Sequence, residues 1–236
     1  MQGTPLFIRK TLAWSVHLFT ASGAVWGFLA LLAVFAHDWK LAILWMSAAM
    51  VVDGLDGFFA RWADVKTYAT GLDGALLDNL LDYLNYVVVP ALFLIEADLL
   101  PANLALAGAL SILLTSAYQF TQSNAKTDDH YFTGFPDYWN VLVIYMLLLH
   151  WNPWINLAIL VALNILIFIP IKYLYPTRTT RLKKLTVALT LLYGACGLAI
   201  LILYPNAPLW IVYASFFYIV YYLALSLWPR KGSLPS

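Results

Sequence analysis

Long apolar stretches follow one another along the whole chain and constrain its fold more than any other feature. There are eight of them: 12–35, 41–61, 75–95, 102–122, 136–150, 154–173, 185–204 and 209–228. A helix needs about 20 apolar residues to cross a bilayer core, so most of these stretches are long enough to span. Stretch 136–150 is short and could instead be re-entrant or interfacial. With 63% hydrophobic and only 11% charged residues, the chain is predicted to be a polytopic membrane protein.

The distribution of basic residues predicts how this protein lies in the membrane. With eight spans and a cytoplasmic amino terminus, 12 of the 13 Lys and Arg residues fall on the cytoplasmic side, and only Lys40 lies opposite. The positive-inside rule therefore places both termini in the cytoplasm. The connections are too short for a soluble domain, so we expect residues 1–236 to form one all-α membrane helix bundle. No cleavable signal pattern precedes the first stretch, which we expect to act as the targeting signal.

Acidic residues are concentrated in one short window. Of the 12 in the chain, half lie between positions 53 and 82: Asp53, Asp56, Asp64, Asp73, Asp78 and Asp82. The spacings of three (Asp53, Asp56) and four (Asp78, Asp82) put each pair on one face of its helix. The second stretch runs down to the cytoplasm and the third runs back, so the two pairs should meet at the same depth. Ionisable groups at membrane depth are costly and indicate a functional site.

Four facing carboxylates would repel one another unless cations neutralised them. Oxygen ligands suit hard ions, so this pattern predicts a Mg²⁺ or Mn²⁺ site. The alternative is a set of solvated acids near helix ends, and we expect that for Asp64 and Asp73 in the connecting loop. Cys196 is the only cysteine and lies within the seventh stretch, so neither a disulfide nor a thiolate metal site is expected.

Small residues accompany the acidic pairs. Gly57 and Ala60 each lie one turn beyond an aspartate of the second stretch, and Gly74 lies one turn before Asp78. These faces carry no bulk, so a flat nucleotide could approach the helix backbones. Arg61 would offer a positive fork at the cytoplasmic rim, or could serve only as a topology anchor.

Together these residues resemble the signature of the CDP-alcohol phosphatidyltransferases. The matching pattern is Asp53-x-x-Asp56-Gly57-x-x-Ala60-Arg61, then Gly74-x-x-x-Asp78-x-x-x-Asp82. The chain departs from the common form in one respect, because its spacer between Arg61 and Gly74 is longer, at 12 residues. A longer spacer is similar to that of the bacterial phosphatidylcholine synthase branch. So are the segments 15–23, 77–90, 126–140 and 178–183, which extend the resemblance over most of the chain.

This resemblance implies a reaction in which CDP-diacylglycerol and choline give phosphatidylcholine and CMP. It also implies two divalent ions, Mn²⁺ or Mg²⁺, held by Asp53, Asp56 and Asp78. Asp82 would be a metal-adjacent carboxylate that acts as the general base. The nucleotide-binding set would be Gly57, Ala60, Arg61 and Gly74. A bacterial inner-membrane enzyme with its site facing the cytoplasm follows, as does a possible homodimer; no nucleic-acid partner is expected.

Choline has a fixed positive charge, so cation–π contact with aromatic faces is the expected mode of recognition. Tyr86 is the first candidate because it lies one turn beyond Asp82 on the same face; Tyr118 and Trp139 come from neighbouring stretches. Any of the three could instead be an interfacial-belt or packing residue. Candidates for the lipid phosphates are Lys126, Arg178 and Arg181, and each could equally be a headgroup or topology anchor.

Two alternatives stay open. A sibling enzyme would use serine, inositol or glycerol phosphate as the acceptor, although the third stretch carries no basic residue to bind an anionic alcohol. A membrane transporter would also place carboxylates in the membrane. It predicts dispersed acids and internal repeats, whereas these acids gather at one end of two adjacent stretches.

Overall fold

The computed structural model describes residues 5–122, 131–174 and 182–228, and most of these residues are helical. The helices are α1 (Leu6–Phe35), α2 (Trp39–Trp62), α3 (Val65–Tyr68), α4 (Gly74–Tyr83), the π-helix η1 (Leu84–Val88), α5 (Val89–Glu96), α6 (Ala105–Thr121), α7 (Trp139–Leu149), α8 (Pro153–Phe168), α9 (Lys183–Leu203) and α10 (Leu209–Leu227). Each of the eight apolar stretches forms a helix, and the third is the continuous run α4–η1–α5. The all-α prediction is confirmed.

Five helices are long and apolar enough to cross a membrane. They are α1, α2, the continuous run Gly74–Glu96, α9 and α10. The three shorter apolar helices are α6, α7 and α8, each of 10–17 residues. The chain is therefore a multi-pass membrane protein, while the count of eight passes and the side of each terminus stay predictions.

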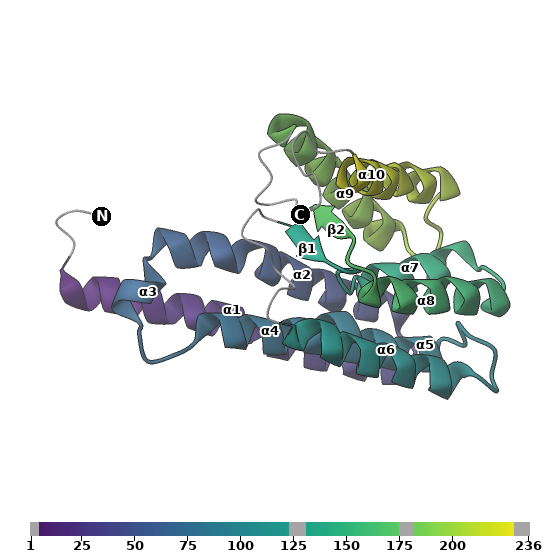
Figure 1. Cartoon of the computed structure of the whole chain (residues 1–236), viewed down its shortest axis with the longest axis horizontal. Coiled ribbons are helices and arrows are strands. Elements are labelled where there is room, and N and C mark those ends of the chain that lie inside the picture. Colours follow the sequence, from purple (N-terminus) through teal and green to yellow (C-terminus); the bar gives the residue numbers. More distant parts are fainter. Residues whose placement is uncertain (1–4, 123–130, 175–181, 229–236) are drawn as a thin grey trace.

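The longest helices are packed side by side. α1 lies against α2 along the long axis of the molecule, and it also contacts α4 and α5 (Figure 1). The main hydrophobic core lies where α5, α6 and α7 pack together, and it includes the fully buried side chains of Trp139, Phe93 and Ile112. α9 and α10 pack mainly on each other, and α10 joins the rest through α7 and a small sheet. The two aspartate pairs predicted to form the site lie on α2 and α4, and both of these helices contact α1.

The small sheet was not anticipated from the sequence. Strands β1 (Tyr131–Thr133) and β2 (Lys172–Leu174) pair antiparallel, with Phe132 opposite Tyr173. The sixth apolar stretch was predicted to continue to residue 173, but α8 ends at Phe168 because Pro170 follows. A residue that precedes proline avoids the helical conformation, and Ile169 is extended with ψ 123°.

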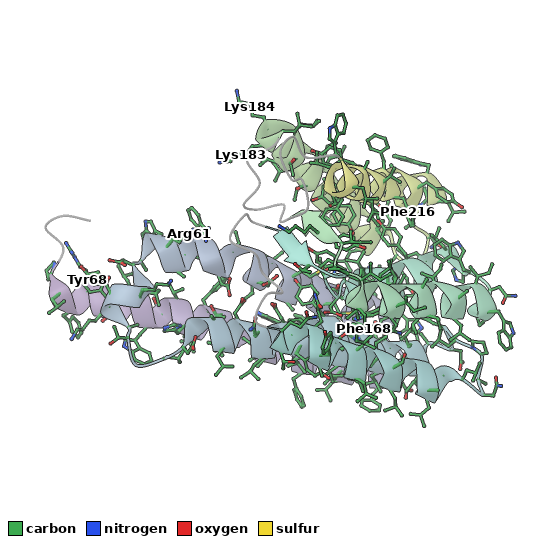
Figure 2. All side chains as sticks on the ribbon, in the orientation of Figure 1. Arg61, Tyr68, Phe168, Lys183, Lys184 and Phe216 are labelled. Carbon is green, nitrogen blue, oxygen red and sulfur yellow. The ribbon has the colours of Figure 1, made fainter. Side chains whose placement is uncertain are left out.

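The lengthened spacer between α2 and α4 folds back onto α1. Val65 of the short helix α3 is buried in a cluster with Ala13 and Val16 of α1. Arg9 of α1 donates a 2.7 Å hydrogen bond to the Tyr68 hydroxyl, and its guanidinium carbon lies 5.6 Å from the centre of the Tyr68 ring. Figure 2 shows Tyr68 and Arg61 at the same end of the molecule. The spacer therefore packs on α1 at the end of the helix bundle that carries Arg61.

The two loop acids, predicted to be merely solvated, are exposed but have local structural roles. Asp64 accepts a 2.9 Å hydrogen bond from the Thr67 hydroxyl. Asp73 is the N-cap of α4, and its Oδ1 accepts hydrogen bonds of 3.0 and 3.1 Å from the backbone N–H groups of Ala75 and Leu76. Such a cap satisfies N–H groups that have no partner within the helix. Asp73 thereby fixes where α4, the start of the third apolar stretch, begins.

Candidate active site

Three aspartate side chains converge between α2 and α4. One carboxylate oxygen from each of Asp53, Asp78 and Asp82 lies within 4.8 Å of the others, and all three side chains are partly buried. Oxygen ligands at this spacing fit a hard divalent cation, whose charge would offset the repulsion among the carboxylates. The helical spacings of the sequence thus bring Asp53 together with the Asp78–Asp82 pair.

Asp56 lies at the same cavity but outside that group of three. All four aspartates line the cavity, together with Thr20 and Gly23 of α1 and several residues of α2, α4 and η1. The Thr20 hydroxyl is a hydrogen-bond partner of Asp56. The first helix therefore forms one wall of the cavity.

Tyr86 connects the cavity wall directly to the carboxylates. Its hydroxyl donates a 2.7 Å hydrogen bond to Asp53 Oδ2, and its side chain is buried. Tyr86 lies in the π-helix η1, which begins directly after α4, and is four residues beyond Asp82. π-Helical turns are rare and occur frequently at functional sites. Here the π-turn places Tyr86 on the face that meets α2.

Asn85, the neighbour of Tyr86, joins α4 to α1. Its side-chain N–H₂ donates to the backbone carbonyl oxygens of Gly23 at 3.1 Å and Leu81 at 2.9 Å. The bond to Gly23 is buried and the bond to Leu81 is partly buried, and an unsatisfied amide in such a setting would be costly. Asn85 therefore holds the cavity wall of α4 and η1 at a fixed distance from α1.

The other residues of the motif lie beside the carboxylate group, toward the end of α2 and the start of α4. Arg61 is exposed in the last turn of α2, and a methyl group added to Gly57 would lie 3.3 Å from Arg61 Nη1. Ala60 is partly buried against the cluster that joins α1 to α3. Gly74 is the first residue of α4, one turn before Asp78. The absence of bulk at Gly57 leaves room for the guanidinium to lie along α2.

The structure separates the three aromatic candidates for choline. Tyr86 lines the cavity, but neither Tyr118 nor Trp139 does. Tyr118 is exposed and stacks on Phe168 of α8, with 5.1 Å between ring centroids; Figure 2 labels Phe168 on that helix. Trp139 is fully buried, and its indole N–H donates to Ser116 Oγ at 2.8 Å and Asp137 Oδ1 at 3.1 Å.

Lys126, Arg178 and Arg181, the candidates for the lipid phosphates, lie outside the residues that the structure describes. Thr20, Gly23 and Asn85 line the cavity but were not selected as site residues. Thr20 and Gly23 belong to a segment of the first stretch that carried the family resemblance, so a signal existed for them. Asn85 lies three residues after Asp82, within segment 77–90, which carried the resemblance as well.

These features are those of a metal-dependent phosphatidyltransferase, and comparison with known proteins agrees. The sequence profile of the CDP-alcohol phosphatidyltransferase family matches residues 15–228. The chain belongs to this family, whose members generally use divalent metals. This membership favours an enzyme over the transporter alternative.

Relatives within the family are similar over nearly their full lengths. The phosphatidylcholine synthase of Legionella pneumophila is 42% identical, across 92% of this chain and 88% of the relative. That of Pseudomonas aeruginosa is 37% identical, across 94% and 93%, and that of Rhizobium meliloti is 31% identical, across 93% of each. The resemblance seen in the motif therefore extends to whole proteins that carry this name.

Proposed function

We propose that this chain is a phosphatidylcholine synthase. The choline hydroxyl oxygen attacks the lipid-side phosphorus of CDP-diacylglycerol, the pyrophosphate bond to CMP breaks, and the hydroxyl proton leaves with a base. The observation that carries the proposal is the meeting of Asp53, Asp78 and Asp82 at one cavity, in a chain similar over nearly its whole length to proteins of this name. The same site makes the chain a phosphotransferase of the CDP-diacylglycerol:choline type.

Asp53, Asp56 and Asp78 are the proposed metal ligands, with Asp82 adjacent to the ions. All four line one cavity, and their oxygen atoms suit Mn²⁺ or Mg²⁺. When bound, two such ions would offset the charge of the pyrophosphate and of the departing CMP. The hydrogen bond from Tyr86 then serves to orient the carboxylate of Asp53, as outer partners of metal ligands commonly do.

Asp82 is the proposed general base. It is partly buried at the cavity and comes from the last turn of α4, so the choline hydroxyl could reach it from the membrane side. Nearby cations stabilise the charged form of a carboxylate, so Asp82 by itself would be a weak base. Proton transfer therefore requires that the hydroxyl be made more acidic at the same site.

The two substrates approach the carboxylates from different directions. The proposed contacts of the nucleotide are the motif residues Gly57, Ala60, Arg61 and Gly74, among which Arg61 offers an exposed guanidinium in the last turn of α2. Tyr86 faces the trimethylammonium group of choline with its ring, and of the three aromatic candidates it alone lines the cavity. Lys126, Arg178 and Arg181 remain the proposed contacts of the lipid phosphates.

Topology completes the proposal. α6, α7 and α8 add three passes to the five long spans, which gives eight with both termini in the cytoplasm and residues 1–236 as one domain. The protein lies in the bacterial inner membrane, with membrane lipids as its surroundings and its site facing the cytoplasm, and forms a homodimer. The carboxylates then lie at the cytoplasmic end of α2 and α4.

The decisive experiment is a panel of acceptor alcohols. Purified protein is supplied with CDP-diacylglycerol labelled in its lipid part, Mn²⁺, and choline, serine, inositol or glycerol phosphate in separate reactions. Labelled phosphatidylcholine and an equal amount of CMP are expected with choline alone. Transfer to another alcohol, or no release of CMP with any of them, would reject the assignment.

A further inference from the structure

His17 of α1 is a buried polar residue that the proposed reaction does not yet use. Its side chain is 5% exposed, and its ring packs against Gly74, the first residue of α4. A methyl group placed on Gly74 would lie 3.1 Å from His17 Cε1 and 3.6 Å from Nδ1. Any larger residue at position 74 would therefore require the imidazole to shift. This contact explains on steric grounds why a glycine fits at position 74.

The Nε2 atom of His17 has no hydrogen-bond partner among the residues that the structure describes. Buried polar atoms in folded proteins are normally paired, and an orphan needs an explanation. The neighbouring ring of Trp14 meets the imidazole edge-on, with 5.8 Å between centroids, which provides packing contact only. His17 also lies outside the group of carboxylates spaced to hold a metal ion. A molecule bound beside Gly74 could supply the missing partner.

Two neighbours show which part of the substrate could reach this atom. Thr20 lies one turn along α1 from His17, lines the cavity and contacts Asp56. Gly74 lies one turn from Asp78 on α4. His17 is thus about one helical turn, roughly 5 Å along the α1 axis, beyond the residue of α1 that meets Asp56, in the direction of the end that carries Arg61. A nucleotide whose phosphates meet the carboxylates would extend its nucleoside over this distance.

We infer that His17 Nε2 hydrogen-bonds the cytidine part of CDP-diacylglycerol and of the product CMP. Ribose hydroxyl groups and the cytosine ring offer both donors and acceptors, so either tautomer of the imidazole can be satisfied. His17 is then a positioning residue for the nucleotide and takes no part in proton transfer. This inference rests on the proposed function, because that function identifies the nucleotide. It does not depend on which alcohol is the acceptor.

The test is CMP binding to the purified full chain in detergent with saturating Mn²⁺, measured by calorimetry. His17→Ala should raise the dissociation constant about fivefold, as expected for one lost hydrogen bond. His17→Gln places an amide near the position of Nε2 and should bind almost as the wild type does, whereas the shorter His17→Asn should not. His37→Ala is the matched control, because His37 is exposed and pairs with Glu96 at 3.7 Å, away from the cavity.

Steady-state kinetics provide the second readout. His17→Ala should raise KM for CDP-diacylglycerol by a similar factor and leave KM for choline unchanged. Equal CMP binding by wild type and His17→Ala, with only a lower melting temperature in the variant, would show a packing role and overturn the inference. Weaker Mn²⁺ binding without nucleotide would do the same, by assigning His17 to the metal.

The two proposals can fail separately. If another alcohol replaces choline in the acceptor panel while His17→Ala still weakens CMP binding, the choline assignment falls and the nucleotide contact stands. If choline is the acceptor and His17→Ala leaves CMP binding unchanged, only the nucleotide contact falls. A wild-type chain that binds no CMP would overturn both.

Discussion

The hydroxyl of Tyr86 donates a 2.7 Å hydrogen bond to Asp53 Oδ2, which joins the π-helical turn after Asp82 to the carboxylate of the facing helix. Tyr86→Phe removes this bond and keeps the ring. Loss of an outer partner of a metal ligand typically costs about 10- to 100-fold in metal affinity or activity. We expect the Mn²⁺ concentration for half-maximal activity to rise about tenfold, with little change in KM for choline. An unchanged Mn²⁺ titration would show that the bond does not orient Asp53.

Tyr86→Ala removes the ring as well. Loss of a desolvated cation–π contact costs about 2 kcal/mol, or roughly 30-fold in affinity. The variant should therefore show a choline KM about 30-fold above that of Tyr86→Phe, in initial-rate assays at saturating Mn²⁺. Equal losses for choline and CDP-diacylglycerol would identify Tyr86 as a packing residue.

Replacement of a proposed metal ligand should abolish activity without preventing membrane insertion. Asp53→Ala, Asp56→Ala and Asp78→Ala each remove an oxygen donor from a partly buried position at the cavity, and none removes a core side chain. Labelled CDP-diacylglycerol assays on purified protein measure the effect. Excess EDTA should reproduce it in the wild type, and added Mn²⁺ or Mg²⁺ should restore turnover. Full activity in EDTA would contradict metal dependence.

Asp82→Asn separates basicity from geometry, because the amide keeps the shape of the carboxylate but is not a comparable base. We expect CDP-diacylglycerol to bind as before and turnover to fall by about 10²- to 10⁴-fold, the usual contribution of a general base. Single-turnover rates with bound substrate measure this step directly. Near-normal turnover would assign the proton transfer to another group.

The cap at the start of α4 should contribute to stability. Asp73→Ala leaves the N–H groups of Ala75 and Leu76 without their side-chain acceptor and should cost about 0.5–2 kcal/mol. The melting temperature in detergent should fall, while Asp73→Asn, which retains an acceptor oxygen, should stay close to the wild type. Equal melting temperatures for the alanine and asparagine variants would show that the cap contributes nothing measurable.

The sequence alone determined the features that depend on local periodicity. Apolar stretches near bilayer length fixed the positions of the helices, because backbone polar groups in lipid must be satisfied within each segment. The spacings of three and four between aspartates determined that each pair shares a helical face. The motif itself, with Gly57, Ala60, Arg61 and Gly74, determined the family.

Only the tertiary structure decided which neighbours these faces meet. Trp139 and Tyr86 were both candidates for choline, with Tyr86 the first. Trp139 is buried in the core, where it hydrogen-bonds Ser116 and Asp137, whereas Tyr86 lines the cavity. The pairing of β1 with β2, the docking of α3 on α1 and the packing of His17 against Gly74 likewise join segments far apart in the chain. Helical periodicity gives the direction of a side chain about its own axis, but its partners depend on how the helices pack.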